Sequence, residues 1–449
     1  MQAASGPVLS PGDLKKLKFW RLSTFWVMLL GYVGYYMVRK NLSAAFPLME
    51  TALGYTNTQL GVIAATSEIA YAIGKFINGP LGDKIGGKRI FLLGMAGAIA
   101  CNFLFAMGST LPYFVAVWCL CRYFLSMGWG GIAKTIGAWY EPERNGTIMG
   151  WISLNFQFGG VLATLFAGML VGLGYTWDKL FIYPAILVCG VWVWSYFASK
   201  ATPADVIPGV EFGKSETGKQ SLANFEAREA AGEKLNVWTI IWTLLQMRVF
   251  RNLLVFSFVT TLLRSIFFFW TPKFLVDIGM GSTNAILKSA IFPFLGCLGT
   301  VLLGWYTDKY AQNGDRARAM WIMLLGLFLS LSGVAYLANA GAAYHNWVVI
   351  LVGLCGFFLL GPYSMSSGCL TLDIAGSRGA GSCTGMIDGM GYIGGALAAW
   401  GAGLMSQYLG WAQVFATLAG VSLVAIVSAF FMSQDFQKMY RLDHDPEES

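Results

Sequence analysis

The chain has 449 residues, of which 56% are hydrophobic, 15% are aromatic and only 12% are charged, and its formal net charge is +7. Soluble globular domains contain about 25% charged residues, so this composition excludes a soluble protein. It predicts an all-α polytopic membrane protein.

Twelve apolar windows follow one another along the chain. A helix of about 20 apolar residues crosses a hydrocarbon core of roughly 30 Å. We therefore predict transmembrane helices over residues 21–45, 58–80, 90–108, 112–138, 147–172, 179–199, 249–273, 284–306, 320–340, 346–371, 380–406 and 411–433. The polar stretch 200–237 is predicted to be a cytoplasmic linker between an N-terminal six-helix half, 1–199, and a C-terminal half, 238–449. Residues 222–234 of this linker have the pattern of an amphipathic surface helix.

Lys and Arg are concentrated in alternate loops. Lys179, Lys273 and Lys288 are the basic residues that fall on the poorer side. By the positive-inside rule, the richer side is cytoplasmic and includes both termini. Nothing resembles an organelle signal, so we expect a multi-pass protein of a bacterial inner membrane, with a eukaryotic endomembrane as the alternative.

Two adjacent cations, Arg39 and Lys40, lie in the first window. A basic residue at the centre of a membrane helix costs about 2.5–3.5 kcal/mol on insertion scales. One interpretation is that both side chains extend to the interface from a helix end. The other is that they face a wet cavity, which is favoured because Tyr32, Tyr36 and Arg39 have the spacing of one helical face.

The two halves carry matching features. A glycine-rich basic motif, Gly79 to Arg89, follows the second window, and a similar motif begins at Gly304 after the eighth. The same offset of 225 residues relates Gly79 to Gly304, Asp83 to Asp308 and Arg39 to Arg264. Parallel repeats of this kind place a substrate site near the bilayer midplane at their interface, where we expect the two arginines to face each other.

Basic residues outnumber acidic ones within the windows. The basic residues are Arg39, Lys40, Lys75, Arg122, Lys134 and Arg264, and the acidic ones are Glu68 and Asp388. A surplus of positive charge favours an anionic substrate. Guanidinium groups bind phosphate through two parallel hydrogen bonds, and they bind carboxylates in the same way.

Two of these residues have open roles at this stage. Lys75 is either a binding residue or the partner of Glu68, seven residues earlier on the same face. Asp388 is either a partner of a buried cation or an acceptor of hydrogen bonds from sugar hydroxyls.

The repeated loop motif resembles that of the major facilitator superfamily. This resemblance implies a fold of 12 transmembrane helices in two six-helix halves. It also implies a gating motif at Gly79, Asp83, Arg89, Gly304 and Asp308.

A narrower resemblance is to the organophosphate:phosphate antiporter family, which includes glycerol-3-phosphate and hexose-phosphate transporters and sugar-phosphate exchangers. It rests on the stretches Gly31–Asn41, Ala70–Phe76, Met127–Trp129, Leu262–Arg264 and Gly391–Gly395. The resemblance implies a secondary transporter that exchanges a phosphorylated metabolite for inorganic phosphate by alternating access.

The family also implies roles for individual residues. Arg39 and Arg264 would clamp the phosphate, and the surrounding cavity would contain Tyr32, Tyr36, Lys40, Lys75 and Tyr392. Two positions depart from relatives: Asn155 replaces a histidine of the best-known bacterial members, and Asp388 stands where hexose-phosphate transporters carry a lysine. An amide does not titrate near neutral pH, which argues against protonation at position 155.

An enzyme is not expected, because the windows contain no Ser/His pair, HExxH motif or paired catalytic carboxylates. No cofactor or metal is expected, and the partners are the lipid bilayer, an organic phosphate and inorganic phosphate, bound by a monomer. The alternative function is a membrane sensor that binds sugar phosphate with little transport.

Overall fold

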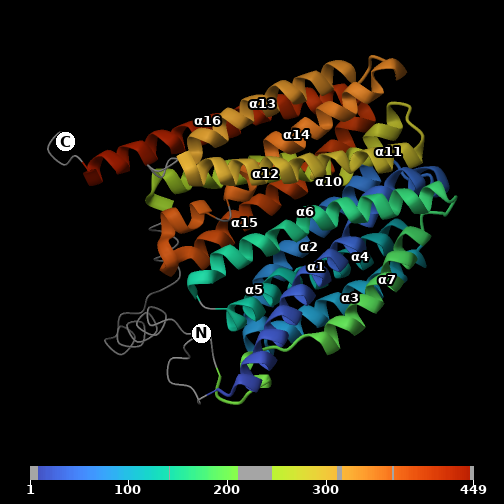
Figure 1. Cartoon of the computed structure of the whole chain (residues 1–449). Coiled ribbons are helices and arrows are strands. Elements are labelled where there is room, and N and C mark those ends of the chain that lie inside the picture. The colour runs from blue at the N-terminus through green and yellow to red at the C-terminus, as the bar shows by residue number, and fades with distance from the viewer. Residues whose placement is uncertain (1–8, 141, 211–244, 311–315, 367–368, 445–449) are drawn as a thin grey trace. The chain divides into compact units, whose positions relative to one another are not determined.

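The computed structural model describes residues 9–140, 142–210, 245–310, 316–366 and 369–444, and every regular element in this part of the chain is a helix (Figure 1). The amphipathic segment predicted at 222–234 lies outside the described residues. The helices are α1 (Pro11–Leu53), α2 (Asn57–Ile85), α3 (Gly87–Ala106), α4 (Leu111–Leu125), α5 (Met127–Trp139), α6 (Pro142–Gly172), α7 (Lys179–Ala198), η1 (Pro203–Asp205), α10 (Arg248–Asp277), α11 (Ser282–Ser289), α12 (Ile291–Tyr310), α13 (Arg316–Leu337), η2 (Ala342–Tyr344), α14 (His345–Ser366), α15 (Cys369–Tyr408) and α16 (Trp411–His444).

Every predicted window coincides with one helix or with two consecutive helices. The fourth window is interrupted at Ser126, between α4 and α5, and the eighth at Ala290, between α11 and α12. Among the described residues, nine segments are long and apolar enough to cross a membrane. Helix α1 is not among these nine segments. It carries the charged residues Arg39 and Lys40 within its apolar stretch.

The helices form two compact units. Unit 1 comprises Met1–Arg39, Ala70–Ala163 and Asp178–Leu235, and unit 2 comprises Lys40–Ile69, Thr164–Trp177 and Asn236–Ser449. Three continuous helices, α1, α2 and α6, therefore have one end in each unit. Residues 40–69 and 164–177 belong to unit 2 here, whereas the sequence-based division places them in the N-terminal half. The division into halves at the linker 200–237 remains a prediction.

Unit 1 is built around α3, which packs against α4, α5 and α7. Aromatic rings fill the contact: the ring centroid of Phe105 lies 4.3 Å from that of Phe181 and 4.7 Å from that of Phe114. The turn from α2 to α3 is made at Gly86, whose φ of 88° is a left-handed conformation that favours glycine. This glycine lies within the repeated loop motif.

Unit 2 contains three tightly packed helix pairs, α10 with α15, α12 with α14, and α13 with α16. The α12–α14 pair depends on glycine, because a Cβ at Gly356 would collide with the carbonyl oxygen of Phe292, and one at Gly299 with that of Phe357. Small residues let membrane helices approach closely, which increases their van der Waals contact.

The ends of α1 and α2 contribute polar contacts to unit 2. Lys273 is only 1% exposed, and its Nζ forms ion pairs with Asp277 and, at 2.7 Å, with Glu50 near the end of α1. Trp411 Nε1 donates a hydrogen bond of 2.8 Å to Asp277. Asn57, the first residue of α2, donates a hydrogen bond of 3.1 Å to Ser406 of α15.

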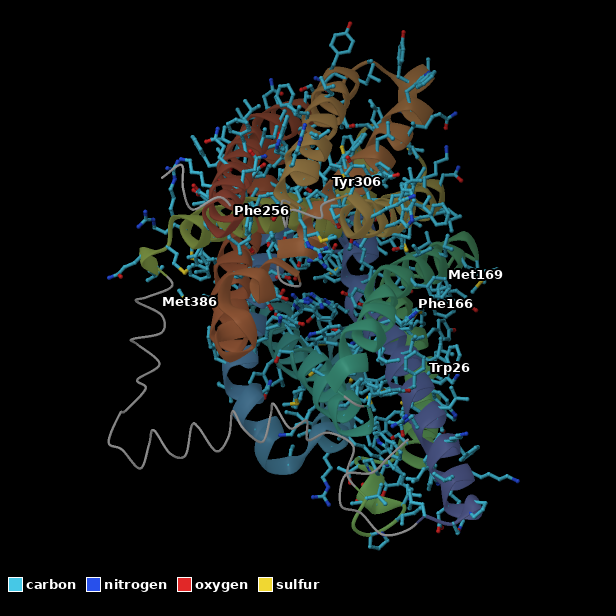
Figure 2. The ribbon with its side chains drawn as sticks, turned by 60° about the vertical axis from the view of Figure 1, so that its left-hand side comes forward. Trp26, Phe166, Met169, Phe256, Tyr306 and Met386 are labelled. Carbon is cyan, nitrogen blue, oxygen red and sulfur yellow. The ribbon has the colours of Figure 1, made fainter. Side chains whose placement is uncertain are left out.

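Large apolar side chains point outward from both units. Figure 2 shows Trp26 on α1, Met169 on α6 and Tyr306 on α12, which are 47%, 49% and 49% exposed. A soluble protein does not cover its exterior with such residues. The exterior thus suits lipid, as expected for a multi-pass membrane protein.

We predict that Gly356→Val destabilises the protein, because the added methyl groups force α14 away from α12. The cost of overpacking is typically about 1–3 kcal/mol, and we expect the unfolding midpoint to fall by about 3 °C or more. The midpoint is measured on purified protein in detergent by size-exclusion chromatography after heating. Gly420→Val on α16 is the matched control, because nothing lies within 4 Å of a Cβ at that position. Equal midpoints for the two variants would contradict the prediction.

Candidate functional site

The predicted face of α1 is present in unit 1. The ring of Tyr32 lies 5.7 Å from that of Tyr36, and the guanidinium carbon of Arg39 lies 5.4 Å from the Tyr36 ring. Arg39 is only 6% exposed, so its charge is buried in the middle of α1. The guanidinium therefore does not extend outward from a helix end, and the wet cavity of the other interpretation remains a prediction.

Tyr71 on α2 gathers three cations around its ring. Arg122 lies 4.4 Å from the ring centroid, Arg39 lies 4.8 Å away and Lys75 lies 5.6 Å away. A cation within about 6 Å of an aromatic ring is attracted by the electron density of its face. We call these four residues the Tyr71 cluster.

Asn102 on α3 fixes the level at which α1 and α4 meet. It is fully buried, and its Nδ2 donates to the carbonyl oxygen of Val38 at 3.1 Å and to Cys121 Sγ at 3.6 Å. Val38 precedes Arg39, and Cys121 precedes Arg122. One amide therefore holds both arginines of the Tyr71 cluster in register.

A second amide fixes α2. Asn78 Nδ2 donates hydrogen bonds to Ser126 Oγ at 2.7 Å and to the carbonyl oxygen of Tyr123 at 3.3 Å, at the break between α4 and α5. Gly74 packs against the same serine, and a Cβ there would collide with it. Gly74 and Asn78 lie on either side of Lys75, so these contacts set the height of the lysine.

Asn155 on α6 is buried near the same face of α1. It is 2% exposed, and neither amide atom has a hydrogen-bond partner within the described part of the chain. Gly159, one helical turn later, packs against Tyr36, where a Cβ would lie 3.0 Å from the Tyr36 Cβ. A buried amide without partners costs free energy and is a natural ligand for a polar molecule.

Arg264, which the 225-residue offset relates to Arg39, lies in unit 2. Its guanidinium carbon lies 4.8 Å from the ring of Tyr363 on α14 and 5.6 Å from that of Phe268 on α10. Lys40 Nζ lies 4.1 Å from the Phe268 ring and donates a hydrogen bond to the Phe268 carbonyl oxygen. The adjacent residues Arg39 and Lys40 thus belong to different units.

Three glycines of α15, Gly391, Gly394 and Gly395, pack against the turns of α10 before and after Arg264. A Cβ at Gly391 would meet Thr261, and one at Gly395 would meet Ser265. The same run carries Tyr392, and Asp388 lies one turn before it; both side chains are half-buried. Glu68, on the same helix as Lys75, has its Oε2 3.7 Å from a Cβ built at Gly395 of α15. The pairing of Lys75 with Glu68 remains a prediction.

The two loop motifs lie at the ends of α2 and α12, after the second and eighth predicted windows. Gly79 and Asp83 are in the last turns of α2, and Arg89 is exposed at the start of α3. Gly304 and Asp308 are in the last turns of α12. The side chains of Asp83 and Asp308 lie outside the described residues, so the gating role remains a prediction. Lys134, counted with the buried cations, is exposed on α5.

Several supporting residues were not singled out from the sequence. Phe268 is one helical turn after Arg264, and this spacing predicts that the two side chains lie on the same face of the helix. Tyr71 lies in a stretch that carries the family resemblance, but it had no assigned role. Tyr363 and Asn102 come from helices distant in sequence, and no local pattern indicates their positions.

Comparison with known proteins decides the family. The sequence profile of the Major Facilitator Superfamily matches residues 28–399. The chain belongs to this superfamily. Solved structures agree: the chain matches a D-xylose–proton symporter with a TM-score of 0.72 at 14% identity, covering 92% of this chain and 97% of that one. It matches a bacterial homologue of the human lysosomal transporter Spinster with a TM-score of 0.73 at 15% identity, covering 93% and 98%.

Full-length sequence relatives fit the narrower resemblance. A probable hexose phosphate transport protein of Chlamydia trachomatis is 29% identical, over 92% of this chain and 91% of that protein. The glycerol-3-phosphate transporter of Bacillus subtilis is 26% identical, over 94% of each chain. The membrane sensor protein UhpC of Salmonella typhimurium is 24% identical, over 93% and 92%. Such relatives fit the organophosphate:phosphate antiporter family and a transport protein of the facilitator superfamily that is not an enzyme.

We predict that Asn102→Leu lowers the stability of the protein, because a leucine of similar size cannot donate the hydrogen bonds that join α1 and α4. Loss of a buried hydrogen-bond donor costs about 1–3 kcal/mol, which corresponds to a midpoint lower by several degrees. Thermal unfolding in detergent measures the effect. Asn346→Leu is the control, because Asn346 is exposed and accepts a hydrogen bond of 2.8 Å from Lys288 at the surface. If the control loses as much stability as Asn102→Leu, the positioning role of Asn102 is wrong.

Proposed function

We propose that this protein exchanges a phosphorylated metabolite, a sugar phosphate or glycerol-3-phosphate, for inorganic phosphate by alternating access. The observation that carries the proposal is the pair of arginines at matching repeat positions. Arg39 in unit 1 and Arg264 in unit 2 each lie against aromatic rings in the middle of a membrane helix. The hexose-phosphate and glycerol-3-phosphate transporters among the relatives support the substrate class.

Both arginines bind the phosphate in this proposal. A phosphate ester carries about −1.5 to −2 charges and strong acceptor oxygens. A guanidinium matches these oxygens with a planar fork of donors. The aromatic neighbours Tyr36, Tyr71 and Tyr363 restrict the orientation of each fork and keep water away, which strengthens the attraction.

The same charges explain exchange rather than one-way transport. Without an anion, any movement that removes water from both arginines leaves two buried positive charges, which is costly. A bound phosphate dianion neutralises them, so the loaded protein changes conformation faster than the empty one. Unloading one substrate must then be followed by loading of another, and no proton is required.

The remaining candidate residues have subsidiary roles in this proposal. Lys40 and Lys75 add positive charge, Tyr32 and Tyr392 supply hydroxyl groups, and the amide of Asn155 binds the substrate beyond the phosphate. Asp388 accepts hydrogen bonds from substrate hydroxyls when it is not paired with a cation. The loop motifs at the ends of α2 and α12 act as gates, and the protein works as a monomer in a bacterial inner membrane with cytoplasmic termini.

Purified protein in liposomes tests the proposal. We expect labelled phosphate to enter only vesicles that are preloaded with phosphate, and one phosphate ester to inhibit that uptake better than citrate. Arg39→Lys and Arg264→Lys should each reduce exchange at least tenfold, because the two-pronged fork is lost and each charged hydrogen bond contributes about 1.5–3 kcal/mol. Arg248→Lys is the control, since Arg248 is an exposed arginine of α10 paired with Asp435 at 3.7 Å. Undiminished exchange by both arginine variants would refute the clamp.

A sensor function has one supporting observation, the similarity to the membrane sensor UhpC. The liposome experiment separates the two functions. A sensor binds the phosphate ester with measurable affinity, but it does not exchange phosphate across the membrane.

We further predict that Asn155→His introduces a pH dependence that the wild type lacks at this position. A histidine becomes protonated as the pH falls through about 6.5 and then adds a positive charge beside the substrate. The ratio of variant to wild-type exchange should therefore rise between about pH 7.5 and 5.5, and this ratio cancels the titration of the phosphate itself. Asn155→Gln, which does not titrate, should give a flat ratio. A flat ratio for the histidine variant, together with unchanged exchange by both the histidine and the glutamine variants, would place residue 155 away from the substrate.

A further inference from the structure

Helix α1 carries an exposed apolar stripe toward its N-terminal end, and Figure 2 labels one member, Trp26. The side chains of Phe19, Leu22, Trp26 and Leu30 are 65%, 58%, 47% and 43% exposed, and their spacing places them on one face of the helix. We call these four residues the α1 stripe. At a rise of 1.5 Å per residue, the α1 stripe is about 17 Å long, which is close to half of a hydrocarbon core of about 30 Å. The α1 stripe therefore matches the acyl chains of a single leaflet.

Three exposed lysines lie at the N-terminal end of the α1 stripe. Lys15 is one helical turn before Phe19 and continues the same face, and Lys16 and Lys18 lie on either side of it. The acidic residue of these turns is Asp13, which interacts electrostatically with Lys16. Three lysines and one carboxylate leave a formal charge of +2 at the level that lipid headgroups occupy.

The end of α7 brings a further cation to the same place. Lys200 Nζ lies 4.9 Å from the centroid of the Trp20 ring, and the backbone N–H of Lys200 donates a hydrogen bond of 3.2 Å to Thr24 Oγ1. Asp205, the acidic residue of this segment, accepts a hydrogen bond of 3.0 Å from the backbone N–H of Thr202 at the start of η1. The position of Lys200 beside α1 is thus fixed by its own backbone.

A surface that joins an apolar stripe to a group of lysines fits an amphipathic anion. Basic residues next to a membrane helix attract anionic headgroups, whereas a zwitterionic headgroup has no net charge to attract. A small soluble anion, in turn, makes no use of the α1 stripe.

We propose that α1 binds an anionic phospholipid, with the lipid phosphate among Lys15, Lys16 and Lys18 and an acyl chain along the α1 stripe. This site is separate from the proposed substrate site, and it does not depend on phosphate exchange.

The test compares two lipids that differ in headgroup charge. The purified full chain in neutral detergent is titrated with phosphatidylglycerol or with phosphatidylcholine of the same acyl chains, and native mass spectrometry measures the bound lipid. Each basic residue near an anionic lipid surface strengthens binding by roughly a factor of five. We therefore expect the wild type to bind phosphatidylglycerol at least tenfold more tightly than phosphatidylcholine.

Variants of the lysines assign this preference to α1. The triple variant Lys15→Gln, Lys16→Gln and Lys18→Gln should reduce the preference to less than threefold. Lys18→Gln alone should reduce it by about a factor of five. Lys179→Gln is the matched control and should leave the preference unchanged, because Lys179 begins α7 at the end opposite Lys200 and pairs with Asp178 at 3.0 Å.

A third ligand tests the role of the α1 stripe. Glycerophosphoglycerol is the headgroup of phosphatidylglycerol without its acyl chains, and it should bind at least tenfold more weakly than the lipid. If it binds as tightly as the lipid, the lysines form a site for a soluble anion and the phospholipid is rejected.

Two other outcomes overturn the proposal. Equal affinity of the wild type for phosphatidylglycerol and phosphatidylcholine excludes a site for an anionic lipid, and this result decides the matter even if the triple variant does not fold. A preference that survives in the triple variant places the anionic lipid away from α1.

Discussion

The rest of this structure depends on arginine side chains that are buried within membrane helices against an aromatic ring. Arg39 and Arg122 lie on the same tyrosine ring, and Lys75 lies beside it. Burial of such charges in a low-dielectric interior is costly, and aromatic faces recover only part of that cost. A bound anion would offset part of the remaining cost, and the phosphate substrate proposed above is such an anion.

Positioning of the charges depends on uncharged groups. Asn102 and Asn78 donate hydrogen bonds that tie α1, α2 and α4 together, and Gly74 lets α2 approach the break at Ser126. In unit 2, glycines of α15 allow close contact with α10 on both sides of Arg264. Amides and glycines do not add to the charge of the site, so they hold the arginines in place without weakening the field that an anion experiences.

Much of the architecture follows from the sequence. The twelve windows match the helices because a run of about 20 mostly apolar residues is the main signature of a membrane-spanning helix, and it remains visible where buried charges dilute it, as in α1. The face formed by Tyr32, Tyr36 and Arg39 was predictable from helical spacing. In contrast, Tyr363 and Asn102 reach the site from other helices, and packing between helices has no signature in a local pattern. The same is true of Arg122, whose charge is evident in the sequence but whose approach to Tyr71 is not.

The border between the units falls within α1, between Arg39 and Lys40, and this has a consequence for biogenesis. During synthesis, residues 40–69 enter the membrane long before the helices with which they cluster. The Lys40 amine finds its acceptor only when Phe268 has been made, and Glu50 finds its ion-pair partner only with Lys273. The N-terminal helices therefore remain incompletely folded while the second half of the chain is translated, and their final packing is completed only after α10 and α15 have been inserted.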